Sequence, residues 1–176
     1  MVRASVLAFA LFALLPITAF AHGPTRQKVV ETVEIDASPD EVWKVIGDFQ
    51  DMSWHPAISK SQGNGENEVN ATRMLTLQSG GTIAEKLIKF DTDKKSYKYE
   101  ITDVDVKVLP VKNYSSTLSV KGEGDKSTVQ WKGAFYRGFM NNDPPPELSD
   151  EAAIKAVKGV YRGGLDALKE KVEAGG

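Results

Sequence analysis

The sequence predicts an α+β fold in which a curved antiparallel sheet wraps around a long C-terminal helix, with two short helices after the first strand. A strand pattern over residues 27–36 passes directly into a capped helix at Ser38. Short alternating segments separated by turn residues fill residues 58–135, and short turns favour antiparallel pairing. An apolar stripe at helical spacing then runs to Val172. A cavity between the sheet and the helix is the default binding site of such a fold.

The start of the first helix can be placed from its capping residues. Ser38 suits the N-cap, Pro39 suits the first helical position, and Glu41 completes a capping box with Ser38. Gly47 is expected to end or bend this helix. The segment from Asp48 to Trp54 is expected to form the second short helix, which the following His-Pro pair would end.

The strands between residues 58 and 135 are separated by groups of turn residues. These groups are Gly63-Asn64-Gly65, Ser79-Gly80-Gly81, Asp91-Thr92-Asp93 and Gly122-Glu123-Gly124-Asp125. Within each strand one face is richer in apolar or aromatic side chains, as expected of a half-buried strand. Glu85 lies among apolar neighbours on such a face, and we expect it to form a structural ion pair with Arg73.

The segment after the strands should be a stiff loop followed by the final helix. Three successive prolines, Pro144 to Pro146, are expected to keep the loop extended. Ser149 suits the N-cap of the helix, and the acids after it complement the helix dipole. The apolar stripe consists of Ile154, Val157, Tyr161, Leu165, Leu168 and Val172. We therefore expect the whole length of this helix to dock on the sheet.

Residues 1–21 have the features of a secretory signal peptide. Arg3 supplies the positive charge, an apolar run follows, and Ala19-Phe20-Ala21 is a small-x-small cleavage site. A membrane anchor is the alternative, but Pro16 interrupts the run before it reaches the length of a span. We expect cleavage after Ala21, one domain over residues 22–176, a periplasmic location and no stable membrane insertion.

Charge and residue content exclude several classes of function. The chain has 22 basic and 24 acidic residues in a mixed order without a basic patch, so nucleic acid is not an expected partner. It has no cysteine, which excludes thiol chemistry. His22 would become the N-terminal residue, where its amine and imidazole could chelate copper(II) or nickel(II). Because a second set of ligands is missing, we expect no metal site, and no cofactor.

Aromatic residues on the apolar strand faces, with the Trp54-His55 pair, are the candidates for lining a cavity. They are Trp54, His55, Tyr97, Tyr99, Tyr114, Trp131 and Phe135. Simple core packing explains the strand aromatics equally well. His55 is also a candidate general base, oriented by Asp48 or Asp51, although the alternative of an inert, hydrogen-bonded ring is favoured because no partner nucleophile is evident. No catalytic residue is therefore predicted.

The Trp54-His55 region is one candidate contact surface for a protein partner. The stiff loop is the other, because a rigid segment loses little entropy on docking. Its residues are Phe139, Met140, Asn141, Asn142, Asp143, Pro144, Pro145 and Pro146. The alternative is that the loop only connects sheet and helix.

The segment Ile35 to Phe49, I-D-A-S-P-D-E-V-W-K-V-I-G-D-F, resembles the opening of the START-like or polyketide cyclase/dehydrase superfamily, also called SRPBCC or Bet v 1-like. The resemblance implies a helix-grip fold over nearly the whole mature chain. The signal peptide, the Asp48-Phe49 to Trp54-His55-Pro56 run and the segment from Arg137 to Glu147 resemble, more narrowly, the periplasmic MxaD-type proteins of methanol oxidation systems.

The narrower resemblance implies an exported, non-enzymatic accessory protein. Such a protein would promote interaction or electron transfer between methanol dehydrogenase and its cytochrome c acceptor. A second possibility is a periplasmic carrier that holds a small hydrophobic ligand between sheet and helix, and a third is a cyclase or hydrolase that uses His55. The superfamily contains all three kinds of protein, so the fold alone does not choose among them.

Overall fold

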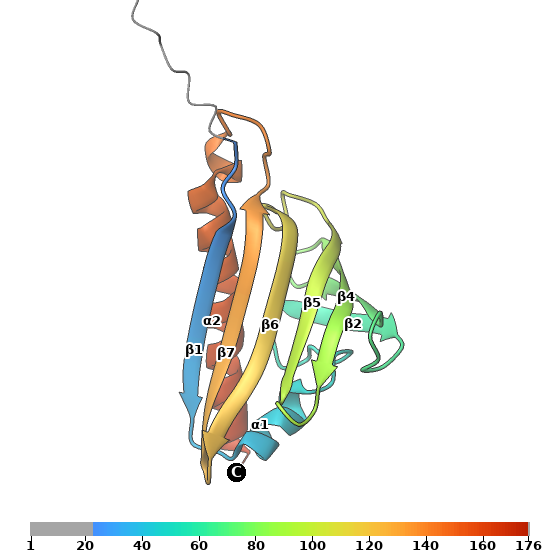
Figure 1. Ribbon diagram of the computed structural model, residues 1–176, viewed down its shortest axis with the longest axis vertical. Coiled ribbons are helices and arrows are strands. Elements are labelled where there is room, and N and C mark those ends of the chain that lie inside the picture. The colour runs from blue at the N-terminus through green and yellow to red at the C-terminus, as the bar shows by residue number, and fades with distance from the viewer. Residues whose placement is uncertain (1–22, 176) are drawn as a thin grey trace, which may run out of the picture.

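Seven antiparallel strands form one curved sheet around a long helix in the computed structural model, which describes residues 23–175 (Figure 1). The elements are β1 (Gln27–Ile35), α1 (Pro39–Ile46), β2 (Ile58–Asn64), β3 (Thr72–Leu77), β4 (Thr82–Asp91), β5 (Ser96–Val104), β6 (Val111–Glu123), β7 (Lys126–Arg137), the short 3₁₀ helix η1 (Pro146–Leu148) and α2 (Asp150–Ala174). The strand order is β1-β7-β6-β5-β4-β3-β2. The predicted fold class is confirmed. The predicted signal peptide and His22 lie outside the described residues.

The first helix begins where its capping residues predict. The Ser38 side chain accepts a hydrogen bond from the Glu41 backbone N–H at 3.3 Å, and the Glu41 carboxylate accepts from the Ser38 backbone N–H at 2.8 Å. Gly47 follows the last helical residue, and its N–H donates to the Trp43 carbonyl. The local signals alone therefore place both ends of α1.

The expected second short helix does not form. Residues 48–57 make successive turns instead, with i to i+3 backbone bonds such as the one from His55 N–H to the Met52 carbonyl at 3.0 Å. The reason is local: the Asp48 and Asp51 carboxylates accept hydrogen bonds from the backbone N–H groups two residues later, at 2.9 and 2.7 Å. Such aspartate turns compete with helix formation.

Helix α2 packs along the concave side of the sheet, against β1 and β7 (Figure 1). Ser149 caps its start by accepting from the Ala152 N–H at 3.2 Å. The predicted stripe faces the sheet, and its central members Val157, Tyr161, Leu165 and Leu168 are buried. Register shifts between β4 and β5 and between β6 and β7 are irregularities of the kind that bends strands. No helix among residues 23–175 is long and apolar enough to cross a membrane.

Candidate functional site

A cavity of about 200 Å³ lies between the sheet and α2. Apolar side chains from the 52–57 turns and from β2, β3, β4 and β5 make most of its wall, with Val160 of α2 closing one side. Six side chains with polar atoms also border it: His55, Ser79, Glu85, Tyr99, Tyr114 and Trp131. The lining reaches the surface at the exposed Ser79, beside the half-buried Val108. The site is therefore an apolar chamber with a few fixed polar groups.

The cavity contains some of the aromatic residues that the sequence singles out. His55, Tyr99, Tyr114 and Trp131 line it. Trp54, Tyr97 and Phe135 are buried in the surrounding core, outside the lining. Because Trp54 and His55 are both buried, the prediction that they form a contact surface for a partner is wrong. Trp54 packs on Trp131, with ring centroids 5.7 Å apart, Tyr97 packs edge-on to Phe49 at 5.9 Å, and Phe135 stacks on Tyr114 at 6.0 Å.

His55 is held between the turn that it belongs to and helix α2. Its Nδ1 accepts a hydrogen bond from the Ala57 backbone N–H at 3.1 Å, so the proton of the neutral ring must lie on Nε2. That nitrogen donates to the Val160 carbonyl at 3.0 Å. Burial lowers the pKa of the imidazole. Because both nitrogens are engaged in a neutral ring, and Asp48 and Asp51 bond to backbone instead, this geometry gives no support to a general base at His55.

This buried neutral histidine predicts a loss of stability in mild acid. The lowered pKa means that below the ordinary value of 6.5 the unfolded chain binds a proton that the folded protein does not. The free energy of unfolding should therefore fall as the pH drops from 7.5 to 5.5, with a limiting slope of about 1.4 kcal/mol per pH unit. Urea unfolding across this range measures the slope.

The control for this prediction is His55→Asn. An asparagine amide can still accept from the N–H two residues later, which keeps the turn, but it does not titrate. The variant should show a flatter profile between pH 5.5 and 7.5. An unchanged slope in the variant would assign the acid sensitivity to other groups.

Four buried side chains form a chain of hydroxyl groups from the cavity to the sheet. Tyr99, Tyr114, Tyr161 and Ser116 lie in sequence, with oxygen separations of 3.5, 2.5 and 2.8 Å. Burial raises the pKa of each tyrosine, so all of the hydroxyls keep their protons. The Ser116 hydroxyl also donates to the Lys132 carbonyl at 2.9 Å.

The bond from Ser116 to the Lys132 carbonyl decides which hydroxyl donates in each of the other bonds. Since the Ser116 proton goes to the carbonyl, Tyr161 must donate to Ser116, and Tyr114 must donate to Tyr161. The Tyr99 oxygen accepts from Trp131 Nε1 at 3.0 Å. The Tyr99 proton has only the long 3.5 Å contact to Tyr114. Tyr99 therefore presents a hydrogen-bond donor to the cavity.

The predicted ion pair forms beside Tyr99, with the Arg73 guanidinium 5.3 Å from the centre of the Tyr99 ring. Arg73 Nε donates to Glu85 Oε2 at 2.6 Å, and both side chains are buried. Arg73 also donates to the Phe49 carbonyl, and its guanidinium lies 4.2 Å from the centre of the Phe49 ring. Burial raises the pKa of Glu85, and the arginine opposes that rise. The pair fixes the position of β3 and β4 beside the cavity.

Two glycines allow α2 and the sheet to come close together. A Cβ on Gly133 of β7 would overlap the hydroxyl of Tyr161. A Cβ on Gly164 of α2 would overlap Cδ2 of His55 and lie 2.8 Å from its Nε2 and 2.9 Å from Cζ3 of Trp131. Glycine at these positions is therefore a packing requirement, and the cavity wall depends on it.

Several residues of the cavity carry no signal in the sequence that marks them as lining residues. Glu85 was expected only as half of an ion pair, and the apolar residues Val108, Leu109 and Val160 were not singled out. The backbone N–H groups of Val108 and Leu109 both donate to the Asp105 carbonyl, so these residues lie in a turn. No strand alternation therefore marks them. Among residues 23–175, no group of three His, Cys, Asp or Glu side chains is placed to hold a metal.

The loop after β7 is fixed by Arg137. This buried arginine donates to the carbonyls of Phe139 and Asn141 at 2.8 and 2.9 Å and pairs with Asp150 at 3.1 Å. Met140 and the three residues after it are exposed, while Phe139, Pro144 and Pro145 are half-buried. Pro144 and Pro145 precede η1, but Pro146 begins that 3₁₀ turn, because proline suits the first helical position. The loop thus has a defined shape at the start of α2.

Comparisons with known proteins agree with this architecture. A protein from Bacillus thuringiensis described as uncharacterized shares 34% identity over 83% of this chain and 98% of its own, with a TM-score of 0.70. The protein XoxI from Bacillus cereus shares 35% identity over 82% of this chain and 94% of its own, with the same TM-score of 0.70. A search of curated proteins gave no match.

A more distant structure shares the fold alone. Norcoclaurine synthase from Thalictrum flavum, solved in complex with dopamine and hydroxybenzaldehyde, is 19% identical over 95% of this chain and 96% of its own, with a TM-score of 0.63. A family model described as "Polyketide cyclase / dehydrase and lipid transport" matches residues 26–173. With the helix-grip architecture and the cavity between sheet and α2, this match shows that the chain belongs to that polyketide cyclase/dehydrase, Bet v 1-like family.

Proposed function

We propose that the protein binds a small, mainly apolar molecule in the cavity between sheet and α2 and does not convert it chemically. The observation that carries this proposal is the cavity itself, about 200 Å³ with a largely apolar wall. An apolar cavity of roughly 150 Å³ in another protein holds a benzene molecule, so a substituted single ring is the size class that fits. The family description, which includes lipid transport, supports binding of an apolar ligand.

The polar groups of the cavity define which apolar molecules fit best. The Tyr99 hydroxyl proton has only the long 3.5 Å contact to Tyr114, so a ligand with a carbonyl or another acceptor can take a shorter hydrogen bond there. His55 has no free nitrogen, and Glu85 is paired with Arg73. These groups can orient a ligand, but the geometry shows no nucleophile with a base beside it, which supports binding over catalysis.

A pair of matched ligands tests this proposal. Acetophenone and ethylbenzene have similar size and shape, but only acetophenone carries an acceptor. We expect both to bind, with acetophenone tighter, and Tyr99→Phe to weaken acetophenone about fivefold while ethylbenzene is unaffected. Calorimetry or chemical-shift titration measures the affinities.

A cavity-filling variant provides the control. Ile83→Phe places a larger side chain on the cavity wall and should abolish binding of both ligands. Val30→Phe, on an exposed position of β1, should leave binding unchanged. Binding of either ligand that survives Ile83→Phe would place the site elsewhere and overturn the proposal.

A second candidate function is favoured by the loop after β7. We propose that the protein is exported to the periplasm and acts as an accessory protein of methanol oxidation, promoting contact or electron transfer between methanol dehydrogenase and its cytochrome c acceptor. The supporting observation is the defined loop that Arg137 holds, with Met140 42% exposed. A preformed apolar contact costs little entropy on docking, which suits a weak and transient complex.

Turnover of methanol dehydrogenase with its own cytochrome c tests the second candidate. Adding the mature protein should stimulate turnover to a saturating level, and Met140→Ala should raise the concentration needed for half of the effect. Met74→Ala is the matched control, because Met74 is equally exposed, at 43%, but lies on β3. Absence of stimulation would reject the accessory role without affecting the ligand proposal.

A further inference from the structure

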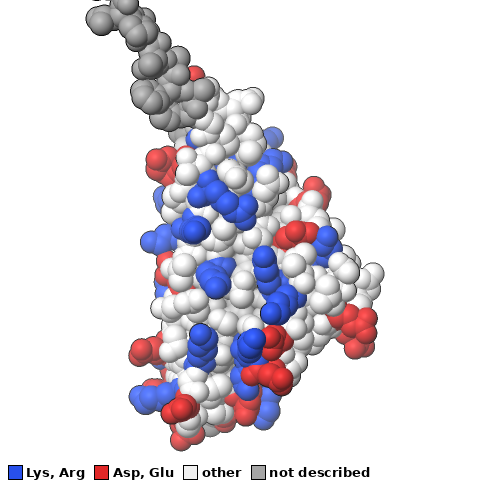
Figure 2. Space-filling view, in the orientation of Figure 1, with Lys and Arg blue, Asp and Glu red and all other residues white. Residues whose placement is uncertain are grey.

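The face of the sheet that points away from α2 carries a group of lysines without acidic partners. Lys28, Lys98, Lys112, Lys121 and Lys132 are exposed, and none forms a salt bridge with a described residue. They lie on β1, β5, β6 and β7. We call this group the lysine face. Figure 2 shows the same side of the molecule, with basic atoms spread over the middle of the sheet and acidic atoms mainly toward its margins.

The strand register shows that these lysines share one face. Thr117 of β6 pairs with both Lys98 of β5 and Lys132 of β7, so the two lysines flank it, roughly 10 Å apart across two strand spacings. Lys132 in turn pairs with Val30 of β1. Gly133, the next residue after Lys132, faces Tyr161 of α2, so Lys132 points to the opposite side.

The same alternation places the remaining lysines on this face. Lys28 pairs with Ala134, and Lys112 pairs with Tyr136, which are two and four residues beyond Lys132 on β7. Lys121 pairs with Thr128, four residues before Lys132. The period of a strand is two residues, so all of these side chains stand on the outer face.

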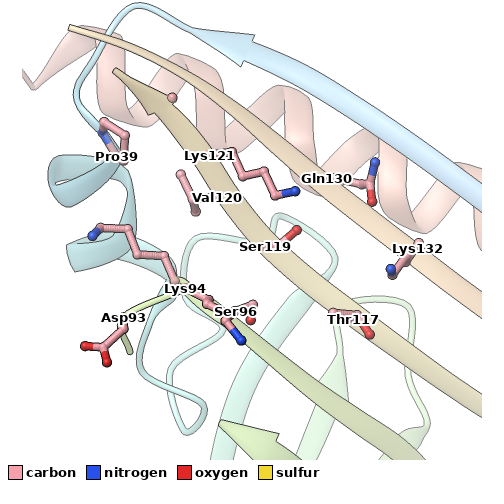
Figure 3. Close-up of a pocket in the computed structure, with 12 residues that line it drawn as sticks. Pro39, Asp93, Lys94, Ser96, Thr117, Ser119, Val120, Lys121, Gln130 and Lys132 are labelled. Carbon is pink, nitrogen blue, oxygen red and sulfur yellow. The ribbon is translucent and has the colours of Figure 1, made fainter. Parts of the chain in front are cut away.

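Short polar side chains separate the lysines and form an open groove of about 500 Å³ (Figure 3). Lys121 and Lys132 border this groove together with hydroxyl and amide side chains of β5, β6 and β7. These side chains are Ser96, Thr117, Ser119 and Gln130. Lysines above a layer of hydroxyl and amide groups provide both positive charge and hydrogen-bonding partners for carboxylates.

The positive charge is local, because the whole chain has a formal net charge of −2. Of the acids on the outer face, Glu100 pairs with Lys86 at 2.8 Å. Glu34 is exposed near the end of β1, away from Lys98 and Lys132. It pairs with Thr128, which also pairs with Lys121, so Glu34 lies roughly 10 Å from Lys121 across two strand spacings. Lys95, which lines the groove, pairs with Asp40 at 2.8 Å, and the exposed Asp93 lines the groove as well (Figure 3). The five lysines of the lysine face thus form a surface of net positive charge on a slightly acidic protein, with Glu34 and Asp93 beside it as acids that form no salt bridge with a described residue.

We propose that the lysine face is a docking surface for an acidic surface of a protein partner. Lysine ammonium groups are compact, hydrated charges that steer a partner and release it readily. A membrane surface fits less well, because among residues 23–175 Val30 is the one exposed large apolar side chain on the four strands that carry these lysines. Single-stranded nucleic acid also fits less well, since binding it takes a series of exposed aromatic platforms. Beside these lysines stands the half-buried Tyr136, which pairs with Lys112 and is covered by Arg26 at 5.7 Å.

A charge-reversal experiment tests the proposal with poly-L-glutamate as the acidic polypeptide. The wild-type protein should bind it at low ionic strength, with an affinity that falls steeply as salt is added. The variant Lys98→Glu/Lys132→Glu should bind about tenfold more weakly or worse. The control Lys60→Glu/Lys155→Glu makes the same change in net charge at exposed lysines of β2 and α2, outside the lysine face, and should stay within about twofold of the wild type. Circular dichroism checks that both variants fold.

Three outcomes would overturn the proposal. The first is no binding of poly-L-glutamate even at low salt. The second is equal weakening in the two double variants, which would show that only net charge matters. The third is tighter binding to phosphatidylglycerol vesicles or to DNA than to poly-L-glutamate at equal charge concentration, which would assign the face to another class of ligand. Because the lysine face and the cavity lie on opposite sides of the sheet, none of these results bears on ligand binding.

Discussion

Replacing Arg73 by methionine is expected to destabilise the fold by about 3–5 kcal/mol. The substitution keeps much of the side-chain volume but leaves the Glu85 carboxylate buried without its partner at 2.6 Å. It also removes the donor to the Phe49 carbonyl and the guanidinium that lies over the Phe49 ring. Urea unfolding at neutral pH gives the change in the free energy of unfolding.

The double variant Arg73→Met/Glu85→Met separates the two contributions. Apolar replacement of both partners removes the unpaired charge, so the double variant should be more stable than the sum of the single changes predicts, by about 1–3 kcal/mol. If the effects of the two single substitutions simply add, the ion pair does not couple the strands as described.

Replacing Gly164 by alanine is expected to destabilise the protein by about 1–3 kcal/mol, although alanine is the better helix former. The new methyl group would overlap His55 and lie 2.9 Å from Trp131, so α2 must move away from the cavity wall. Thermal or urea unfolding measures the loss. The same variant should also weaken the bond between His55 and the Val160 carbonyl.

The adjacent Gly163 provides the matched control. It is exposed on the same helix, and nothing lies within 4 Å of the Cβ that it would gain. Gly163→Ala should therefore stabilise the protein by about 0.5–1 kcal/mol through helix propensity alone. A loss of stability of similar size in both variants would mean that helix propensity or flexibility, and not contact with His55, decides the effect.

The parts of the fold that the sequence predicted well depend on short-range signals. The capping box of Ser38 and Glu41 needs only four residues, and strand alternation was sufficient to place Arg73 opposite Glu85. The second short helix was predicted wrongly, and the cause is also a short-range interaction. Asp48 and Asp51 can cap their own turns, and that local competition outweighs the helical pattern.

The cavity and the lysine face could be predicted less well because both depend on how distant strands come together. Alternation decides which face a residue occupies, but it does not decide its position relative to α2. Tyr99 therefore lines the cavity, whereas Tyr97, two residues earlier on the same face, packs on Phe49. The lysines of the outer face are scattered between residues 28 and 132, so the mixed sequence gave no sign of a basic patch.

The hydrogen bond from His55 to the Val160 carbonyl also constrains how a molecule reaches the cavity. It fastens the 52–57 turns to α2, so a ligand cannot pass between these elements unless the bond breaks. The other boundary of the chamber runs from Ser79, after β3, to Val108, where the side chains are exposed or half-buried. We expect ligands to enter and leave there, and the rate of exchange should depend on the size of residue 108 more than on residue 55.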